Sequence, residues 1–267
     1  MSEFTIFGAS GFVGSALVRR LTADGRTVRI VTRQTWPAPG VHLGHVIFTI
    51  GMTADFREKP FETVDSQVIA LHRALIDYQF SSFLGLSSTR VYRGAVNTSE
   101  EAALLLNPAN PDDLYNATKL AGEALLLTLR NPEIRVARLS NIYGTPAPSS
   151  SFLAAVIAEA QSRGSVVFRT GAQSAKDYLA VDSAIEMLVN IAERGKHRLY
   201  NVASGKNTSN GEIMSALGRL GIACRVEPAA PEPIFPEIST LRVQAEFPSR
   251  IPDVLEALPA LLADQGR

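Results

Sequence analysis

A glycine-rich turn near the amino terminus constrains the fold of this chain more than any other stretch. The apolar segment at residues 4–7 runs into Gly8-Ala9-Ser10-Gly11-Phe12-Val13-Gly14, and apolar residues then recur at helical spacing. Strand, glycine turn and helix together form a dinucleotide-binding unit, because glycine lets the backbone approach a pyrophosphate and the helix terminus supplies N–H groups. The spacing is Gly-x-x-Gly-x-x-Gly, so an ordinary glycine turn is the alternative. The residues predicted to bind the cofactor here are Gly8, Ser10, Gly11, Phe12, Val13 and Gly14.

The end of the second predicted strand, at residues 28–32, indicates which cofactor is used. An acidic residue at this point binds the ribose 2′-hydroxyl of NAD, whereas an arginine suits the 2′-phosphate of NADP. The strand ends in Thr32-Arg33, and no Asp or Glu occurs between Asp24 and Asp55. We therefore predict NADP, with Arg33 on the phosphate. NAD stays possible, because a solvated arginine at a strand end is the alternative.

The connection after this strand is unusually short. Only residues 33–45 separate it from the next apolar strand, at 46–50, and a single crossover takes about a dozen residues. The third strand of the usual half-sheet must be shortened or absent. The fold class predicted is α/β, a Rossmann-type doubly wound parallel sheet with a reduced third-strand region. Gly51 closes the strand beside the expected cofactor groove.

Composition narrows the class of protein. The chain has 267 residues, 46% of them hydrophobic, and a formal net charge of +0, so nothing in it attracts nucleic acid or an anionic membrane. No apolar run reaches membrane-spanning length, and the first residues do not read as a signal peptide. The single Cys224 suits a reducing cytoplasm. We expect a cytoplasmic protein without nucleic-acid or membrane partners and without a metal, since His42 and His45 have no local acidic or sulfur ligand.

The rest of the chain alternates strands and helices. Further strands are predicted at 83–86, 135–139, 166–169 and 199–203, and helices at 60–78, 112–130, 152–162, from 183, 210–220 and 253–262. A loop rich in proline and serine at 145–151 marks a boundary. We predict a cofactor-binding Rossmann domain over 1–145. Residues 146–267 would form mainly a small substrate-binding lobe, with some segments returning to the sheet.

Two side chains in the predicted helix at 112–130 have the spacing of an acid–base pair. Tyr115 and Lys119 are four residues apart and share one helix face. A phenol titrates near 10, and a neighbouring ammonium lowers that pKa, so such a tyrosine can exchange a proton with an alcohol or ketone. The pair also occurs by chance on surface helices. Ser87-Ser88-Thr89 ends a predicted strand where open α/β sheets bind ligands, although turn-capping serines are the alternative.

Seven segments in chain order resemble one known family. They are Gly8-Ala9-Ser10-Gly11-Phe12-Val13-Gly14, Pro60-Phe61-Glu62-Thr63-Val64-Asp65-Ser66, Leu86-Ser87-Ser88-Thr89-Arg90-Val91-Tyr92, Tyr115-Asn116-Ala117-Thr118-Lys119, Arg138-Leu139-Ser140-Asn141-Ile142-Tyr143-Gly144, Lys176-Asp177-Tyr178-Leu179-Ala180-Val181-Asp182 and Tyr200-Asn201-Val202. They are similar to the extended short-chain dehydrogenase/reductase family, in its NAD-dependent epimerase/dehydratase (nucleotide-sugar) branch. The resemblance covers nearly the whole chain.

The resemblance implies a role for each matching residue. Tyr115 would be the general acid/base, Lys119 would lower its pKa and hold the nicotinamide ribose, and Ser88 would hydrogen-bond the reacting oxygen. Both Tyr115 and Lys119 would thus also contact the cofactor. Substrate-binding residues would be Ser88, Thr89, Asn141 and Lys176. The family also implies a homodimer that pairs the tyrosine-bearing helix and its neighbour across a two-fold axis.

Three departures from the family pattern bear on function. Thr89-Arg90 follows Ser88 where the dehydratases carry Asp-Glu, which argues against water elimination. Lys176 replaces a diphosphate-binding arginine and loses its bidentate fork. Prolines stand where a second such arginine is expected, and Arg242 is the nearest substitute.

Three functions follow from this pattern. The first is an NADPH-dependent reductase of a keto-sugar, with a nucleotide-linked sugar as the expected substrate. The second is a nucleotide-sugar epimerase that retains NAD. The third, of a different class, is a non-catalytic NADP-sensing protein, which the presence of Tyr115, Lys119 and Ser88 together disfavours.

Overall fold

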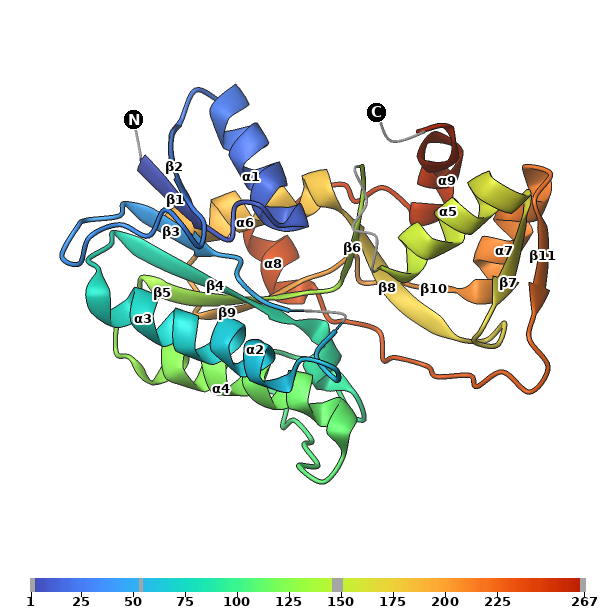
Figure 1. Cartoon of the computed structure of the whole chain (residues 1–267), viewed down its shortest axis with the longest axis horizontal. Helices are drawn as coiled ribbons and strands as arrows, with labels where there is room; N and C mark the ends of the chain where they lie inside the picture. The colour runs from blue at the N-terminus through green and yellow to red at the C-terminus, as the bar shows by residue number, and fades with distance from the viewer. Residues whose placement is uncertain (1–2, 53–54, 146–150, 265–267) are drawn as a thin grey trace.

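A parallel sheet of six strands forms the centre of the protein. The structure is a computed structural model that describes residues 3–52, 55–145 and 151–264. The sheet has the order β2-β1-β3-β4-β5-β9, and every neighbouring pair is parallel (Figure 1). Its strands are β1 (Glu3–Phe7), β2 (Thr27–Val31), β3 (His45–Phe48), β4 (Ser82–Ser88), β5 (Ile134–Leu139) and β9 (Leu199–Val202). Because helices cover both faces, the inner strand β5 is buried at every residue. The predicted doubly wound α/β fold is confirmed.

The predicted reduction of the third-strand region is also confirmed. Strand β2 lies at the edge of the sheet, and residues 32–44 cross to β3 without a helix or a strand of the sheet. Aromatic packing anchors this short connection: the Trp36 ring lies 5.1 Å from that of Phe7, and Tyr78 Oη donates to the Pro37 carbonyl at 2.7 Å. The edge of the cofactor half-sheet is thus closed by packing instead of by a further strand.

Helices lie on both faces of this sheet (Figure 1). On one face are α1 (Phe12–Ala23) and α6 (Val181–Arg194), and on the other are α2 (Pro60–Val64), α3 (Ala70–Asp77) and α4 (Leu114–Thr128). The helix predicted at 60–78 is one rod in which a π-helical turn, Asp65–Ile69, joins α2 to α3. Gly85 of β4 lets α4 approach closely, since a Cβ there would lie 2.4 Å from Leu126 Cδ1. This approach brings the tyrosine-bearing helix against the end of β4.

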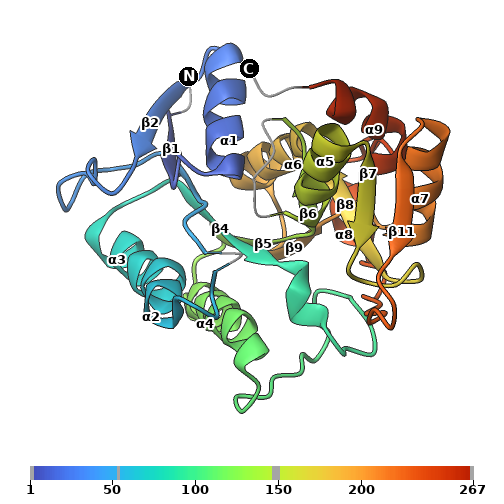
Figure 2. The same cartoon turned by 45° about the vertical axis from the view of Figure 1, so that its right-hand side comes forward.

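A second, smaller core follows in the chain (Figure 2). Its elements are α5 (Phe152–Arg163), β7 (Ser165–Phe168), α7 (Asn210–Arg219), β11 (Ala223–Val226) and α9 (Val254–Ala263). A three-stranded sheet has the order β10-β8-β6, built from β10 (Asn207–Ser209), β8 (Ala175–Ala180) and β6 (Asn141–Tyr143). The sequence did not predict β6, β8, β10, β11 or α8 (Leu241–Glu246). Most of the predicted loop, 146–150, lies outside the described residues.

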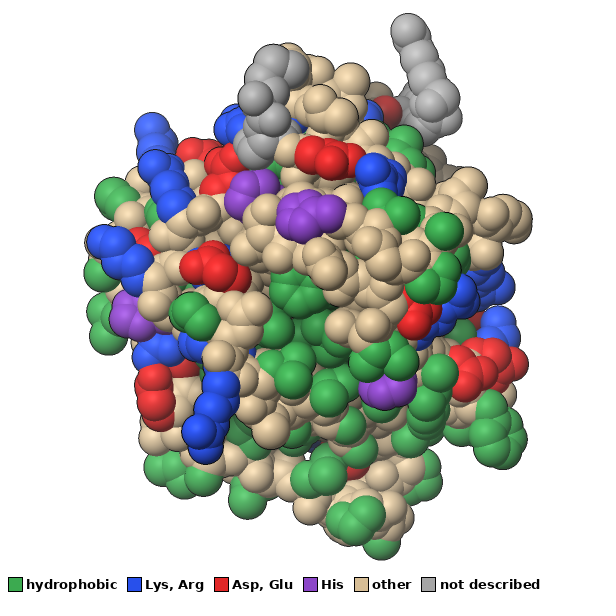
Figure 3. Space-filling view, turned by 90° about the vertical axis from the view of Figure 1, so that its left-hand side faces the viewer, with side chains coloured by type: hydrophobic (Ala, Val, Ile, Leu, Met, Phe, Trp, Pro, Cys, Tyr) green, Lys and Arg blue, Asp and Glu red, His purple; other side chains and the backbone are tan. Residues whose placement is uncertain are grey.

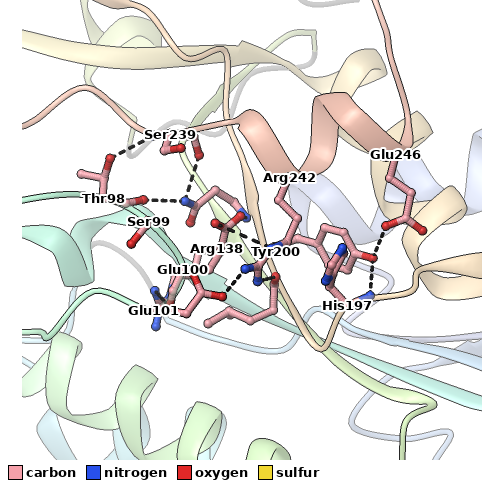
Figure 4. A network of polar contacts seen from close by, with 12 residues as sticks. Thr98, Ser99, Glu100, Glu101, Arg138, His197, Tyr200, Ser239, Arg242 and Glu246 are labelled. Carbon is pink, nitrogen blue, oxygen red and sulfur yellow. Dashed lines mark hydrogen bonds and ion pairs between the residues drawn. The ribbon is translucent and has the colours of Figure 1, made fainter.

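A buried polar network ties α4 to the sheet, and Figure 4 shows the part of it around Arg138, Thr98 and Ser239. Arg138 of β5 forms a bidentate ion pair with Glu123 of α4, with contacts of 3.0 and 2.6 Å, and both side chains are 5% exposed. Arg138 Nη1 also donates to Tyr92 Oη at 2.7 Å, and Tyr92 Oη donates to Asn201 Oδ1 at 2.8 Å. The Asn201 amide in turn donates to the carbonyls of Thr98 and Ser239. Strands β5 and β9, helix α4 and two loops are therefore held by one chain of hydrogen bonds.

Arg242 belongs to the same region and has partners within the chain (Figure 4). Its guanidinium donates to the Leu199 carbonyl at 2.8 Å and forms ion pairs with Glu100 and Glu101. These contacts do not favour Arg242 as the substitute for a diphosphate-binding arginine. The carboxylates of Glu100 and Glu101 neutralise its charge. They lie more than 140 positions earlier in the sequence, so the sequence alone did not indicate this pairing.

The surface carries both signs of charge. On the face shown in Figure 3, Lys and Arg side chains alternate with Asp and Glu around a central group of apolar side chains. Within 3–52, 55–145 and 151–264, no helix is long and apolar enough to cross a membrane.

Candidate active site

The structure brings Ser88, Tyr115 and Lys119 together. Ser88 is the last residue of β4, and Tyr115 and Lys119 lie one turn apart on α4. The Ser88 side chain lies near enough to the Tyr115 hydroxyl to lower the pKa of that phenol. Lys119 Nζ lies 5.8 Å from the centroid of the Tyr115 ring and donates to the Leu86 carbonyl at 3.1 Å. A strand end and a helix face thus present a hydroxyl, a phenol and an ammonium to one place.

Burial raises the pKa of Tyr115. The side chain is 5% exposed, and removing a phenolate from water costs more than the hydrogen bond from Ser88 and the charge of Arg90 return. The predicted fall in this pKa, caused by Lys119, is therefore wrong for this structure. The phenol stays protonated at neutral pH, which suits a proton donor.

Burial lowers the pKa of Lys119 to about 8, although the charge of Glu123 one turn further along α4 opposes that fall. The pKa of this lysine, ordinarily 10.5, thus lies close to neutral pH. The chain accepts an energetic cost to keep an ammonium beside Tyr115, which is typical of a functional site.

From the lowered pKa of Lys119 we predict how Lys119→Met changes the free energy of unfolding. A fall in pKa from 10.5 to about 8 corresponds to at most roughly 3 kcal/mol. We expect the variant to be more stable than the wild type by about 1–3 kcal/mol at pH 7. The folded lysine loses its proton near pH 8 and the unfolded one only near 10.5, so wild-type stability rises between these values and the difference shrinks.

Urea unfolding at pH 7 and at pH 10 measures this difference. Lys196→Met is the matched control, because it removes the same charge from an exposed side chain. A Lys119→Met variant that is less stable than the wild type at pH 7 would contradict the prediction.

The glycine turn has the geometry of a pyrophosphate cradle. Helix α1 starts after Gly11, and no side chain caps its first N–H groups. Gly8 has φ +79°, and a Cβ at Gly14 would lie 2.3 Å from the Gly8 carbonyl oxygen. Only glycine fits both positions, so the turn stays tight and its backbone stays open to a ligand. These residues fit a dinucleotide bound at the helix terminus.

Gly51 lies beside Lys119, and Arg33 lies at a strand end joined to the glycine turn. A Cβ at Gly51 would lie 3.2 Å from Lys119 Nζ, so the glycine leaves space beside the lysine. Arg33 is exposed just past β2, and a backbone hydrogen bond of 3.1 Å from Gly8 to Val31 joins that strand end to the turn. The Arg33 side chain has no hydrogen bond or ion pair with any described residue.

The remaining predicted residues, Thr89, Asn141 and Lys176, lie on three different elements. Thr89 is 8% exposed and starts the short 3₁₀-helix Thr89–Tyr92. Asn141 is exposed on β6 and donates to the Asp177 carbonyl at 2.8 Å. Lys176 lies on the neighbouring strand β8, with Nζ 4.8 Å from the centroid of the Phe152 ring. In the described part of the chain, no three His, Cys, Asp or Glu side chains are arranged to hold a metal.

Two residues beside Tyr115 were not predicted. The Phe56 ring lies 5.6 Å from the Tyr115 ring, and the Arg90 guanidinium carbon lies 5.4 Å from the Tyr115 ring centroid. Phe56 belongs to no motif. Arg90 was visible as the residue that replaces an acid, but nothing in the sequence indicated that its side chain turns toward Tyr115.

The doubly wound sheet, the open glycine turn and the Ser88–Tyr115–Lys119 group define an NAD(P)-dependent enzyme. The sequence model of the NAD dependent epimerase/dehydratase family matches residues 4–69 and 41–203. This chain belongs to that family, as the resemblance of its motifs predicted.

Individual relatives match along the whole chain. The UDP-glucose 4-epimerase of Mycolicibacterium smegmatis is 26% identical over 303 residues, covering 98% of this chain and 95% of the relative. The structure of RMD from Pseudomonas aeruginosa, complexed with NADPH, has a TM-score of 0.77 and 21% identity, covering 98% of both chains. The UDP-glucuronic acid 4-epimerase of Bacillus cereus, in complex with UDP-glucuronic acid and NAD, has a TM-score of 0.79 and 16% identity, covering 97% of this chain and 98% of that one. These structures share the fold.

Proposed function

We propose that the protein is an NADPH-dependent reductase of a keto-sugar linked to a nucleotide. The observation that carries this proposal is the unpaired Arg33 at the end of β2, beside the glycine turn and without an acidic residue to bind a ribose hydroxyl. RMD, which has the same fold, is complexed with NADPH. NADPH is the usual reductant for a net reduction, so a site for its phosphate favours a reductase.

Each site residue then has a separate task. The nicotinamide cofactor supplies the hydride. The backbone at Ser10, Phe12 and Val13 binds its pyrophosphate, and Lys119 holds its ribose. Tyr115 gives its proton to the ketone oxygen as that oxygen becomes a hydroxyl, and its raised pKa keeps this proton in place until then. Ser88 hydrogen-bonds the same oxygen and polarises the carbonyl.

A nucleotide-sugar epimerase that retains NAD is the second candidate. The match to a UDP-glucose 4-epimerase along the whole chain favours it. It uses the same three side chains, because an epimerase oxidises a sugar alcohol and reduces the ketone again. A dehydratase is disfavoured, because Thr89 and Arg90 occupy the positions of its acid and base.

Cofactor titration separates the two candidates. We expect cofactor-stripped protein to bind NADPH at least ten-fold more tightly than NADH, and Arg33→Ala to remove this preference by losing the contact with the phosphate. Fluorescence titration measures both affinities, and Arg29→Ala on β2 is the control because Arg29 already pairs with Glu3. Equal affinities, or an NAD that stays bound through gel filtration, would replace the reductase with the epimerase.

We further propose that the lobe with α5, α7 and α9 binds the sugar nucleotide, with Asn141 and Lys176 on its phosphate side. This keeps the predicted division into residues 1–145 and 146–267. Strand β9 and helix α6 return to the large sheet.

We also propose a homodimer. Phe61, Ile69 and Ile76 on the α2–α3 rod are 81%, 55% and 66% exposed, although such side chains are usually buried. A two-fold axis beside this rod and α4 would cover them. The gel-filtration run that tests for retained cofactor also reports the mass, and a monomer would overturn this proposal.

A further inference from the structure

Arg90 is a half-buried cation that forms no ion pair with any residue the structure describes. Its guanidinium carbon lies 5.0 Å from the Phe56 ring centroid and 5.4 Å from that of Tyr115, so the group stands between two aromatic rings. Its Nε atom is buried and has no hydrogen-bond partner. The Arg90 backbone N–H donates to Ser88 Oγ at 3.2 Å, which fixes the chain here against the Ser88–Tyr115 pair.

No carboxylate in the described part of the chain neutralises Arg90. The acid whose charge acts on it is Asp112, but Asp112 is hydrogen-bonded to Arg57 and also lies 3.8 Å from Arg93. No described Asp or Glu forms an ion pair with Arg90, and residues 1–2, 53–54, 146–150 and 265–267 contain none. A charge withdrawn from water without a partner is destabilising, so proteins keep one where a ligand supplies the opposite charge.

A second unpaired cation lies within electrostatic reach of Arg90. Lys176 is half-buried, its Nζ lies over the Phe152 ring, and no ion pair involves it in the described ranges. Burial and the charge of Arg90 both lower the pKa of Lys176. Two half-buried cations, neither of which forms an ion pair with a described residue, favour a ligand with negative charge near each.

We propose that Arg90 binds a carboxylate on the sugar ring, next to the reacting carbon, and that the substrate is an acidic sugar nucleotide. This inference rests on the proposed function, in which Tyr115 contacts the reacting oxygen. A group that touches both Arg90 and the neighbourhood of Tyr115 must be a substituent of the reacting ring, and the planar guanidinium matches a carboxylate through two parallel hydrogen bonds. Lys176, on the other lobe, is left for the diphosphate.

Binding of two matched ligands tests the proposal. UDP-glucuronic acid carries a carboxylate on the sugar ring where UDP-glucose carries a hydroxymethyl group. Isothermal titration of the NADP-loaded protein at constant ionic strength should give at least ten-fold tighter binding of the acid. Arg90→Gln should remove this preference and change the affinity for UDP-glucose less than three-fold. Arg93→Gln is the control, because it removes the same charge from an exposed side chain nearby and should keep the preference.

Other outcomes overturn the proposal. Equal binding of both ligands by the wild type would do so. A preference that survives Arg90→Gln would too, and equal weakening of both ligands would assign Arg90 to the diphosphate. If neither nucleotide sugar binds, D-glucuronate and D-glucose carry the same difference without the nucleotide. A Tm raised by D-glucuronate alone, and lost in Arg90→Gln, would support the proposal, and an unchanged Tm would overturn it.

The proposed reductase can fail separately. Failure of the reductase proposal would appear as equal affinities for NADPH and NADH. The titrations with UDP-glucuronic acid and UDP-glucose measure only sugar binding, with the cofactor already bound. Thermal unfolding without ligand shows whether Arg90→Gln is folded. Arg90→Lys keeps the charge without the fork and should retain part of the preference.

Discussion

Replacing Tyr115 with phenylalanine should lower kcat by about 10²- to 10⁴-fold, the range for loss of a positioned proton donor. Phenylalanine retains the ring that packs 5.6 Å from Phe56 and removes only the hydroxyl, which lies near Ser88. The fold and the cofactor site should therefore survive. The expected fall measures the contribution of the proton that Tyr115 gives.

Stopped-flow measurement of NADPH oxidation with a saturating keto-sugar substrate gives the hydride-transfer rate for the wild type and Tyr115→Phe. Tyr78→Phe is the matched control, since Tyr78 is buried but its hydroxyl contacts the Pro37 carbonyl, away from the site. The control should leave kcat unchanged within about three-fold. A fall of less than ten-fold in Tyr115→Phe would reject Tyr115 as the acid, and equal affinity of both proteins for NADPH would show that binding is intact.

Replacing Arg138 with methionine should lower the free energy of unfolding by about 3–5 kcal/mol, the usual cost of breaking a buried ion pair. The change leaves Glu123 charged at a position where its side chain is 5% exposed, and Tyr92 loses the donor at 2.7 Å. The same substitution at the exposed pair Arg163–Glu159, where Arg163 is 69% exposed, should cost less than about 1 kcal/mol.

Urea unfolding of four proteins separates the lost pair from other effects of the substitution. These are the wild type, Arg138→Met, Glu123→Leu and the double variant. We expect the double variant to be more stable than either single one, because no unpaired charge stays buried. A loss below about 1 kcal/mol in Arg138→Met, or additive losses in the double variant, would contradict this account.

The same network explains what several of the recognised motifs do. Tyr92, Arg138 and Asn201 come from three separate motifs and meet in one chain of hydrogen bonds. They hold β5 and β9 against α4, the helix that carries Tyr115. Part of the sequence pattern therefore encodes the scaffold of the site and not its chemistry.

The sequence by itself determined the features that depend on neighbours along the chain. The glycine turn, the Tyr115–Lys119 spacing and the short 33–45 connection each follow from local sterics, helix period or chain length. They predicted the sheet, its missing third strand and the side chains that meet at its edge. Strands β6, β8 and β10 were missed because short strands are defined by partners far along the chain.

Only the tertiary structure decided the electrostatics. Burial raises the pKa of Tyr115, although the helix spacing alone predicted a fall. Arg242 is paired with carboxylates from a distant loop, whereas Arg90 stands unpaired between Phe56 and Tyr115. The pKa and pairing of a charge depend on which distant side chains surround it and on how much water they displace. The spacing of residues along a sequence predicts neither of these quantities. Which charged side chains can bind a substrate is therefore decided only by the folded structure.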